Sequence, residues 1–145
     1  MAANDTIYSP VKQALIKDGW VITDDPYALV YQDERLYADL AAERALLAEK
    51  SGSKIVVEIK SFLGASIMSD LYEALGQCLV YRTVLAELEQ NPPLFLALRD
   101  VVYDRLQQRS IFRLLLERHH LALLIVDTER EEIVQWINRD DIAKL

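Results

Sequence analysis

A chain of 145 residues, 52% hydrophobic and 27% charged, has the composition of an ordinary soluble globular protein and the length of one domain. Its net charge of −7 argues against a free-standing nucleic-acid-binding protein, which is normally basic. Cys78 is the only cysteine, so an intrachain disulfide and zinc sites with several thiolates are excluded. We expect a cytoplasmic protein, because the sequence shows neither a signal peptide nor an apolar run of the roughly 20 residues that span a bilayer.

The first half of the chain predicts one helix followed by short strands. Ser9-Pro10 suits the N-cap and first position of this helix, which Gly19 ends. The following sequence is divided by three turn signals: Asp24-Asp25-Pro26, Asp33-Glu34-Arg35 and Ser51-Gly52-Ser53. Strands are expected over residues 20–23, 27–31, 36–41, 45–48 and 54–60.

The second half predicts helices over residues 67–89 and 100–118 and strands over residues 94–98, 121–126 and 132–137. Asn91-Pro92-Pro93 ends the first of these helices, and Gln108 marks a break in the second. The strand over residues 94–98 is apolar throughout, as in a buried parallel strand. We predict one mixed α/β domain over residues 1–145, in the order α-β-β-β-β-α-β-α-β-β.

The strand over residues 54–60 is the most informative segment, because two charged residues interrupt an apolar run. Side chains alternate between the two faces of a strand, so Glu58 and Lys60 share one face. Asp39 lies upstream and completes the order D…E-x-K, which a large class of metal-dependent nucleases uses. Charged groups on such a strand indicate a site, since burying a charge is costly unless it has a partner.

A magnesium site at Asp39 and Glu58 is one interpretation of this order. Mg²⁺ takes oxygen ligands, often one or two carboxylates with several waters. The ion would polarise a phosphodiester oxygen and activate water, while Lys60 would orient that water or stabilise charge on phosphorus. Gln77 and Tyr81, one turn apart on the next helix, would add polar contacts. The alternative is that Asp39, Glu58 and Lys60 lie on a solvent-exposed sheet face.

These features resemble the PD-(D/E)xK nuclease superfamily, in which a mixed sheet is flanked by helices. The segments VKQALIKDGW, YADLAAERALLAEK, VEIKSFLG, ALGQ and VQWI together resemble the XisH family, the fdxN element excision controlling factors of cyanobacteria. The resemblance covers residues 11–137 and implies a restriction-endonuclease-like fold and a role supporting site-specific excision of a DNA element. It also implies a small companion protein of the XisI type.

The superfamily motif assigns the metal-binding acids to Asp39 and Glu58, the catalytic lysine to Lys60, and the polar helix residue to Gln77. The sequence departs from the motif in two places. Ala38 stands where a proline often precedes the first acid, and the first helix carries no glutamate. That helix offers Lys12, Gln13 and Lys17 instead, and Glu43 and Glu49 are candidates for extra acids.

Other polar residues have two interpretations each. Arg105, Arg109 and Arg113 would form a basic line along one face of a continuous helix, suited to a DNA backbone or simply solvated. His119-His120 lies at the helix end, where positive charge suits the dipole, rather than in a metal-binding pattern. The lone cysteine is predicted to be a core residue, and Trp20 and Trp136 are predicted to be packing anchors.

Three functional hypotheses follow. An excision controlling factor would keep the nuclease-like site and act with DNA, a site-specific recombinase or the companion protein. The chain could also form an oligomer. An active magnesium-dependent DNA endonuclease or nickase would use the intact D…E-x-K directly. A non-catalytic protein-interaction subunit would carry these residues as surface groups. The acidic net charge favours the first hypothesis over the second.

Overall fold

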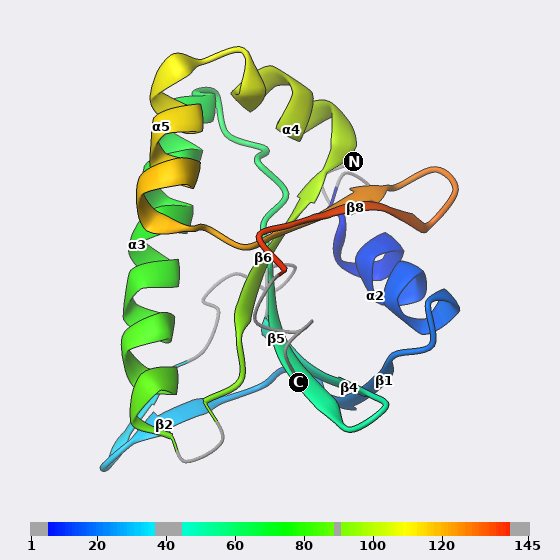
Figure 1. The fold of residues 1–145 in the computed structure, drawn as a ribbon, viewed down its shortest axis with the longest axis vertical. Coiled ribbons are helices and arrows are strands. Elements are labelled where there is room, and N and C mark those ends of the chain that lie inside the picture. The colour runs from blue at the N-terminus through cyan, green and yellow to red at the C-terminus, as the bar shows by residue number, and fades with distance from the viewer. Residues whose placement is uncertain (1–5, 37–44, 89–90, 140–145) are drawn as a thin grey trace.

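The computed structural model describes residues 6–36, 45–88 and 91–139 (Figure 1). Its elements, in chain order, are α2 (Tyr8–Lys17), β1 (Val21–Asp24), β2 (Leu29–Tyr31), β3 (Glu34–Leu36), β4 (Ala45–Lys50), β5 (Ser53–Ile59), α3 (Ile67–Glu87), β6 (Leu94–Arg99), α4 (Asp100–Gln107), α5 (Ser110–His119), β7 (Leu123–Asp127) and β8 (Glu132–Ile137).

Six of the strands form one mixed sheet in the order β1-β4-β5-β6-β7-β8. The central strands β5, β6 and β7 are parallel, and the outer pairs β1–β4, β4–β5 and β7–β8 are antiparallel. Strands β2 and β3 pair with each other in a separate two-stranded sheet. The mixed α/β class predicted from the sequence is therefore confirmed.

The sheet separates two hydrophobic clusters, one on each face. Helix α2 packs on one face, where Trp20 and the half-buried Trp136 lie with their ring centroids 6.0 Å apart. Helices α3, α4 and α5 cover the other face, and α5 runs beside α3 (Figure 1). Strand β6 lies between these layers, which explains why Leu94 to Leu98 are all buried and apolar. The two tryptophans are packing residues, as predicted.

Helix α3 begins at a well-defined N-terminus. The Ser66 side chain accepts a hydrogen bond from the backbone N–H of Ser69, and Asp70 accepts one from the N–H of Gly64 at 2.9 Å. A Cβ at position 64 would lie 2.6 Å from a carboxylate oxygen of Asp70, so a larger residue there would displace this side chain from the Gly64 N–H. These contacts fix the loop that connects β5 to α3 and hence the helix's position over the sheet.

Several predicted boundaries were wrong for local reasons. Helix α2 begins at Tyr8, with Ile7 as its N-cap, because the Val11 N–H bonds the Ile7 carbonyl at 3.0 Å. Ser9 is therefore a residue within the helix and not its cap. The predicted turn over Asp33–Arg35 lies earlier, since Gln32 adopts a positive φ of 55° and β3 already begins at Glu34. The predicted strand over residues 36–41 lies outside the described residues except for its first residue.

Two further differences concern the number of elements. Five strands precede α3, as many as the predicted strand ranges, whereas the predicted order contains four. The second helical stretch is divided into α4 and α5 around Gln108, which confirms the predicted break. The rest of the predicted order, including the β7–β8 hairpin at the end, matches the structure.

Candidate functional site

Glu58 and Lys60 lie at the carboxyl end of β5, on the face covered by α3. Glu58 is the penultimate residue of the strand, and the Lys60 N–H continues its pairing with β6 by bonding the Ala97 carbonyl at 3.3 Å. Ile55, Val57 and Ile59 project to the opposite face, into the cluster around α2. The alternation predicted for this strand is thus confirmed.

Both charged residues are buried. Only 2% of Glu58 and 6% of Lys60 is exposed to solvent. The hypothesis of a solvent-exposed sheet face is therefore wrong for these two residues. It failed because the sequence around the strand does not show that α3 folds back over this end of β5.

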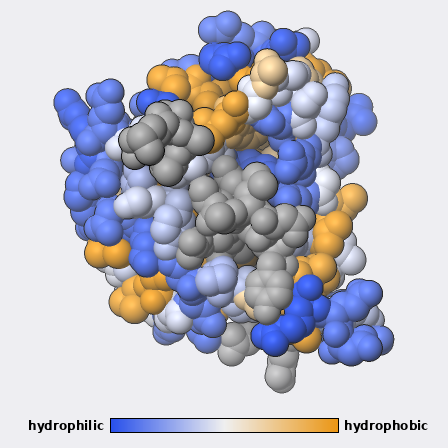
Figure 2. Space-filling model, turned by 180° about the vertical axis from the view of Figure 1, so that it is seen from behind, coloured by the Kyte–Doolittle hydropathy of each residue, from blue (hydrophilic) through white to orange (hydrophobic). Residues whose placement is uncertain are grey.

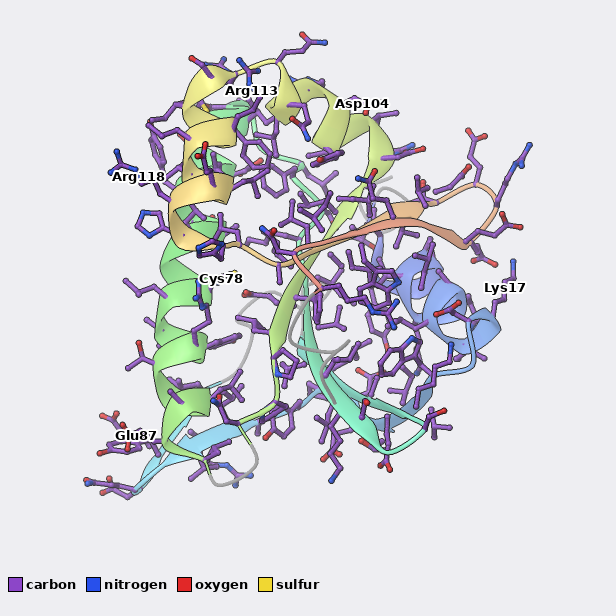
Figure 3. All side chains as sticks on the ribbon, viewed as in Figure 1. Lys17, Cys78, Glu87, Asp104, Arg113 and Arg118 are labelled. Atoms are coloured by element: carbon purple, nitrogen blue, oxygen red, sulfur yellow. The ribbon has the colours of Figure 1, made fainter. Side chains whose placement is uncertain are left out.

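Glu58 interacts with Cys78, which lies near the middle of α3. The Cys78 thiol donates to Oε2 of Glu58 at a distance of 3.3 Å. Burial, reinforced by the negative charge of Glu58 and by this hydrogen bond, raises the pKa of the Cys78 thiol well above its usual range. Figure 3 shows Cys78 on the side of α3 that faces the sheet. Cys78 is a core residue, as predicted, and also a polar partner of the candidate site.

Lys60 interacts with Glu73, which lies in the second turn of α3. The Lys60 ammonium lies 3.1 Å from Oε1 of Glu73, whose side chain is 55% exposed while that of Lys60 is 7% exposed. This pair links the buried lysine to the protein surface. Glu73 was not among the residues predicted from the sequence, although it lies four positions before Gln77 and so continues the series Glu73, Gln77, Tyr81 by one turn.

The other predicted site residues have different positions. Gln77 is half-buried on α3, and no hydrogen bond between described residues joins it to Glu58 or Lys60. Tyr81 is 4% exposed and belongs to the cluster beneath α3. Asp39 and Glu43 lie outside the described residues.

Glu49 does not substitute for a site acid. It pairs with Lys54 across β4 and β5, whereas Glu58 pairs with Ala45 at the other end of the same strands. Lys54 precedes Glu58 by four positions (58 − 54 = 4), a distance of about 13 Å along an extended strand. The proposal that Glu49 adds a carboxylate to the site is therefore wrong.

The predicted basic line is also broken. Arg105 belongs to α4, whereas Arg109 caps α5 and Arg113 lies within it. The Arg113 guanidinium donates to the carbonyl of Gln107 across the break between the helices. These arginines therefore do not share one face of a continuous helix. His119 is the last residue of α5 and His120 is its left-handed C-cap.

Lysine residues of α2 hold that helix in place. Lys12 forms an ion pair with Asp25 at 2.9 Å, and Tyr8 donates to the same carboxylate. Hydrogen bonds to Asp25 and Tyr8 raise the pKa of Lys12. Lys17 donates to the carbonyl of Arg130 in the β7–β8 turn at 2.7 Å. Lys12 and Lys17 thus have structural roles in this helix, which lies on the other face of the sheet from Glu58.

The chemistry available at the site follows from these contacts. One carboxylate and one ammonium are held beneath a helix, and their partners are a thiol and a half-exposed carboxylate. Among the described residues, no group of three or more His, Cys, Asp or Glu side chains is placed to hold a metal ion. Glu58 is the one predicted metal ligand that the described part of the chain contains.

Comparison with known proteins identifies the family of the chain. The family model described as XisH protein matches residues 1–134. The chain belongs to the XisH family. Within the described residues, no helix of this XisH protein is long and apolar enough to cross a membrane.

Two crystal structures are similar to this XisH chain over 90% of its length and 98% of theirs, each at 36% sequence identity. One is an XisH family protein from Nostoc punctiforme PCC 73102, with a TM-score of 0.82. The other is an fdxN element excision controlling factor protein from Anabaena variabilis, with a TM-score of 0.81. Among curated protein sequences, none is significantly similar to this chain.

Proposed function

We propose that this protein is an excision controlling factor that supports site-specific excision of a DNA element through a nuclease-type site at Glu58 and Lys60. The similarity to the Anabaena variabilis protein supports the biological role. The observation that carries the site is the burial of Glu58 and Lys60 together at the carboxyl end of β5. Burying charged side chains generally contributes little to stability compared with well-packed apolar residues. The burial of both residues here therefore favours a chemical role.

The position of β4 supports the D…E-x-K assignment. Ala45, the first residue of this strand, pairs with Glu58. Asp39 precedes Ala45 by six residues (45 − 39 = 6). A short connection therefore separates the predicted first acid from the residue beside the second, as a restriction-endonuclease-like site of the PD-(D/E)xK type requires.

Magnesium fits the oxygen donors of Asp39 and Glu58, which would hold it with bound waters. When bound, Mg²⁺ would polarise a phosphodiester oxygen and lower the pKa of an attacking water. The Cys78 thiol is a soft group that Mg²⁺ does not favour. Glu58 would thus exchange its hydrogen bond with Cys78 for contact with the ion.

Lys60 would act on the phosphate. Its ammonium lies at the carboxyl end of the strand, on the same face as Glu58, and Glu73 draws it toward the surface at 3.1 Å. A phosphodiester approaching from that side would replace Glu73 as the negative partner of Lys60. The lysine would then stabilise charge that develops on the phosphate oxygens during cleavage.

A protein partner would bring this acidic chain to DNA. With a net charge of −7, the chain alone would be repelled by a phosphate backbone at most of its surface. Large hydrophobic side chains are exposed on α3 and on the edge strand β8, including Leu79 at 69% and Val134 at 54%. Figure 2 shows hydrophobic residues on the rear face as separate patches among hydrophilic ones. We infer that the XisI-type companion, and through it a recombinase, contacts such patches.

The deciding experiment measures excision and cleavage separately. Excision is followed with a plasmid that carries the element, in cells that supply the recombinase and the companion. Cleavage is followed on supercoiled and branched DNA with Mg²⁺ or Mn²⁺, with and without the companion. Each assay compares the unsubstituted protein with three single variants, Asp39→Asn, Glu58→Gln and Lys60→Met. Glu87→Gln is the matched control, because Glu87 is an exposed residue at the far end of α3 (Figure 3).

The nuclease-type site predicts that all three site variants lose excision while the control retains it. Loss of cleavage in the same variants would establish the endonuclease. Full excision by Glu58→Gln and Lys60→Met would contradict the proposal of a nuclease-type site and would favour a protein-interaction subunit. Excision that does not depend on the protein at all would overturn the controlling role.

A further inference from the structure

A second concavity lies at the opposite end of the sheet from Lys60. A pocket of about 710 Å³ is formed by the carboxyl-terminal half of α3, the segments that lead into β6 and β7, and the start of β5. Strands β5, β6 and β7 run parallel, so this is their amino-terminal edge. The volume falls within the range of about 300–1,000 Å³ that is typical of small-molecule sites.

The charged residues that line the pocket are both basic, although the chain as a whole is acidic. They are Lys54 and Arg82, and no carboxylate lines the part of the pocket that the structure describes. The Arg82 guanidinium donates to the carbonyl of His119 at 3.3 Å, which holds it between α3 and the end of α5. A guanidinium has five N–H donors, so most of its donors stay available after this contact.

The rest of the wall is largely apolar. Leu75 and Leu85 contribute from α3, and Leu94 and Leu121 from the segments that enter the sheet. A fixed guanidinium at the rim of an apolar cavity suits a molecule with one anionic group and a compact hydrophobic body.

We propose that this pocket binds a small amphipathic organic anion, with the anionic group at Arg82 and the apolar body against the leucines. The site is distinct from the nuclease-type site and does not depend on it. Glu58 and Lys60 are not among its lining residues, although Cys78, which donates to Glu58, also lines the pocket.

The test uses two fluorescent probes with the same aromatic body. Anilinonaphthalene sulfonate carries one negative charge, and phenylnaphthylamine is uncharged. Both are titrated into the full-length protein under native conditions. We expect one saturable site for the sulfonate, and a Kd that rises about tenfold in Arg82→Met, as loss of a charge-assisted hydrogen bond implies. Arg82→Lys should retain most of the affinity, and Kd for the uncharged probe should change less than about twofold.

Two further variants separate the pocket from the general surface. Arg118→Met is the matched control, because Arg118 is exposed on α5 and does not line the pocket. Ala86→Trp places a large side chain at an exposed lining position of α3, which should weaken both probes about tenfold without disturbing the core. Unchanged sulfonate binding in Arg82→Met or Ala86→Trp, an equal loss in Arg118→Met, or no saturable binding at all would overturn the proposal.

Discussion

The thiol of Cys78 and the carboxylate of Glu58 are joined by a 3.3 Å hydrogen bond in the interior of the protein. The contact connects the middle of α3 to the end of β5, which the Lys60–Glu73 ion pair also joins. It gives the one cysteine of the chain a polar role, and it makes the thiol a reporter of the candidate site.

Two substitutions of Cys78 should distinguish the contribution of its packing to stability from the contribution of its hydrogen bond. Cys78→Ser keeps a donor for Glu58 and should change the free energy of unfolding by less than about 1 kcal/mol. Cys78→Val removes the donor and should cost about 1–3 kcal/mol, the penalty for a buried acceptor that loses its partner. Denaturant unfolding monitored by circular dichroism measures both values. Equal losses in the two variants would show that the hydrogen bond contributes nothing.

The raised pKa of Cys78 predicts how stability changes in alkaline solution. In the unfolded chain the thiol loses its proton above about pH 8.5, whereas the folded protein retains it. The folded state then binds more protons, so stability falls as pH rises, by up to about 1.4 kcal/mol for each pH unit. Unfolding curves from pH 7 to 10.5 should show this decline in the protein and less of it in Cys78→Ser. The same decline of stability with pH in both proteins would contradict the raised pKa of Cys78.

Thiol alkylation offers a second measure of the same environment. The reactive species is the thiolate, which is scarce when the pKa is raised, and the side chain is buried. Iodoacetamide should therefore modify the native protein at least about tenfold more slowly than the unfolded chain at pH 8. Glu58→Gln removes the negative charge that raises the thiol pKa, so it should react faster. Rapid labelling of the native protein would exclude the buried Cys78–Glu58 contact.

Lys60 is expected to make the folded protein no more stable, or slightly less stable, than an apolar side chain of similar size at this position. The Lys60 side chain is 7% exposed, and its partner Glu73 is mostly in solvent, so the pair gains little. The unfolding free energy of Lys60→Met should equal that of the unsubstituted protein or exceed it by up to about 1 kcal/mol, because the substitution removes a buried charge whose ion-pair partner is largely solvated. Glu73→Gln should cost less than about 1 kcal/mol. A Lys60→Met variant less stable by more than 1 kcal/mol would assign the lysine a structural role instead.

The Lys12–Asp25 pair should stabilise the packing of α2. Asp25→Asn should lower the free energy of unfolding by about 1 kcal/mol, since the carboxylate accepts from both Lys12 and Tyr8. The pKa of Lys12 is raised in the folded protein, so this contribution is present at neutral pH and is lost as pH rises through that pKa. Asp104→Asn, at an exposed position of α4, is the control and should have no effect. Equal stability of Asp25→Asn and the control would contradict the prediction.

Local patterns in the sequence predicted much of the fold. The alternation through Val56 and Glu58, the prolines after α3 and the apolar run at Leu94 depend on neighbouring residues, and the structure agrees with each. The β2–β3 turn was displaced because Gln32 tolerates a left-handed conformation that no glycine signalled. The burial of Glu58 was not predictable locally, because it depends on how α3 packs, whose Cys78 lies 20 residues further along the chain.

The partners of the candidate site were missed for the same reason. Cys78 fitted the apolar stripe of α3, and its spacing gave no sign that a carboxylate from β5 would reach it. Glu73 was recognisable only as part of a polar row along the helix. The predicted magnesium ligand set stays a prediction, because Asp39 lies outside the described residues.

Helix α3 supplies the partners of both buried charges, Cys78 for Glu58 and Glu73 for Lys60. Water and dissolved ions therefore gain access to both groups in the same event, when this helix separates from β5. The equilibrium for that local opening sets how often the site is available, and amide hydrogen exchange along residues 71–85 measures it. A ligand of Glu58 and Lys60 would then be detected first as lost protection in α3, before any change in the sheet.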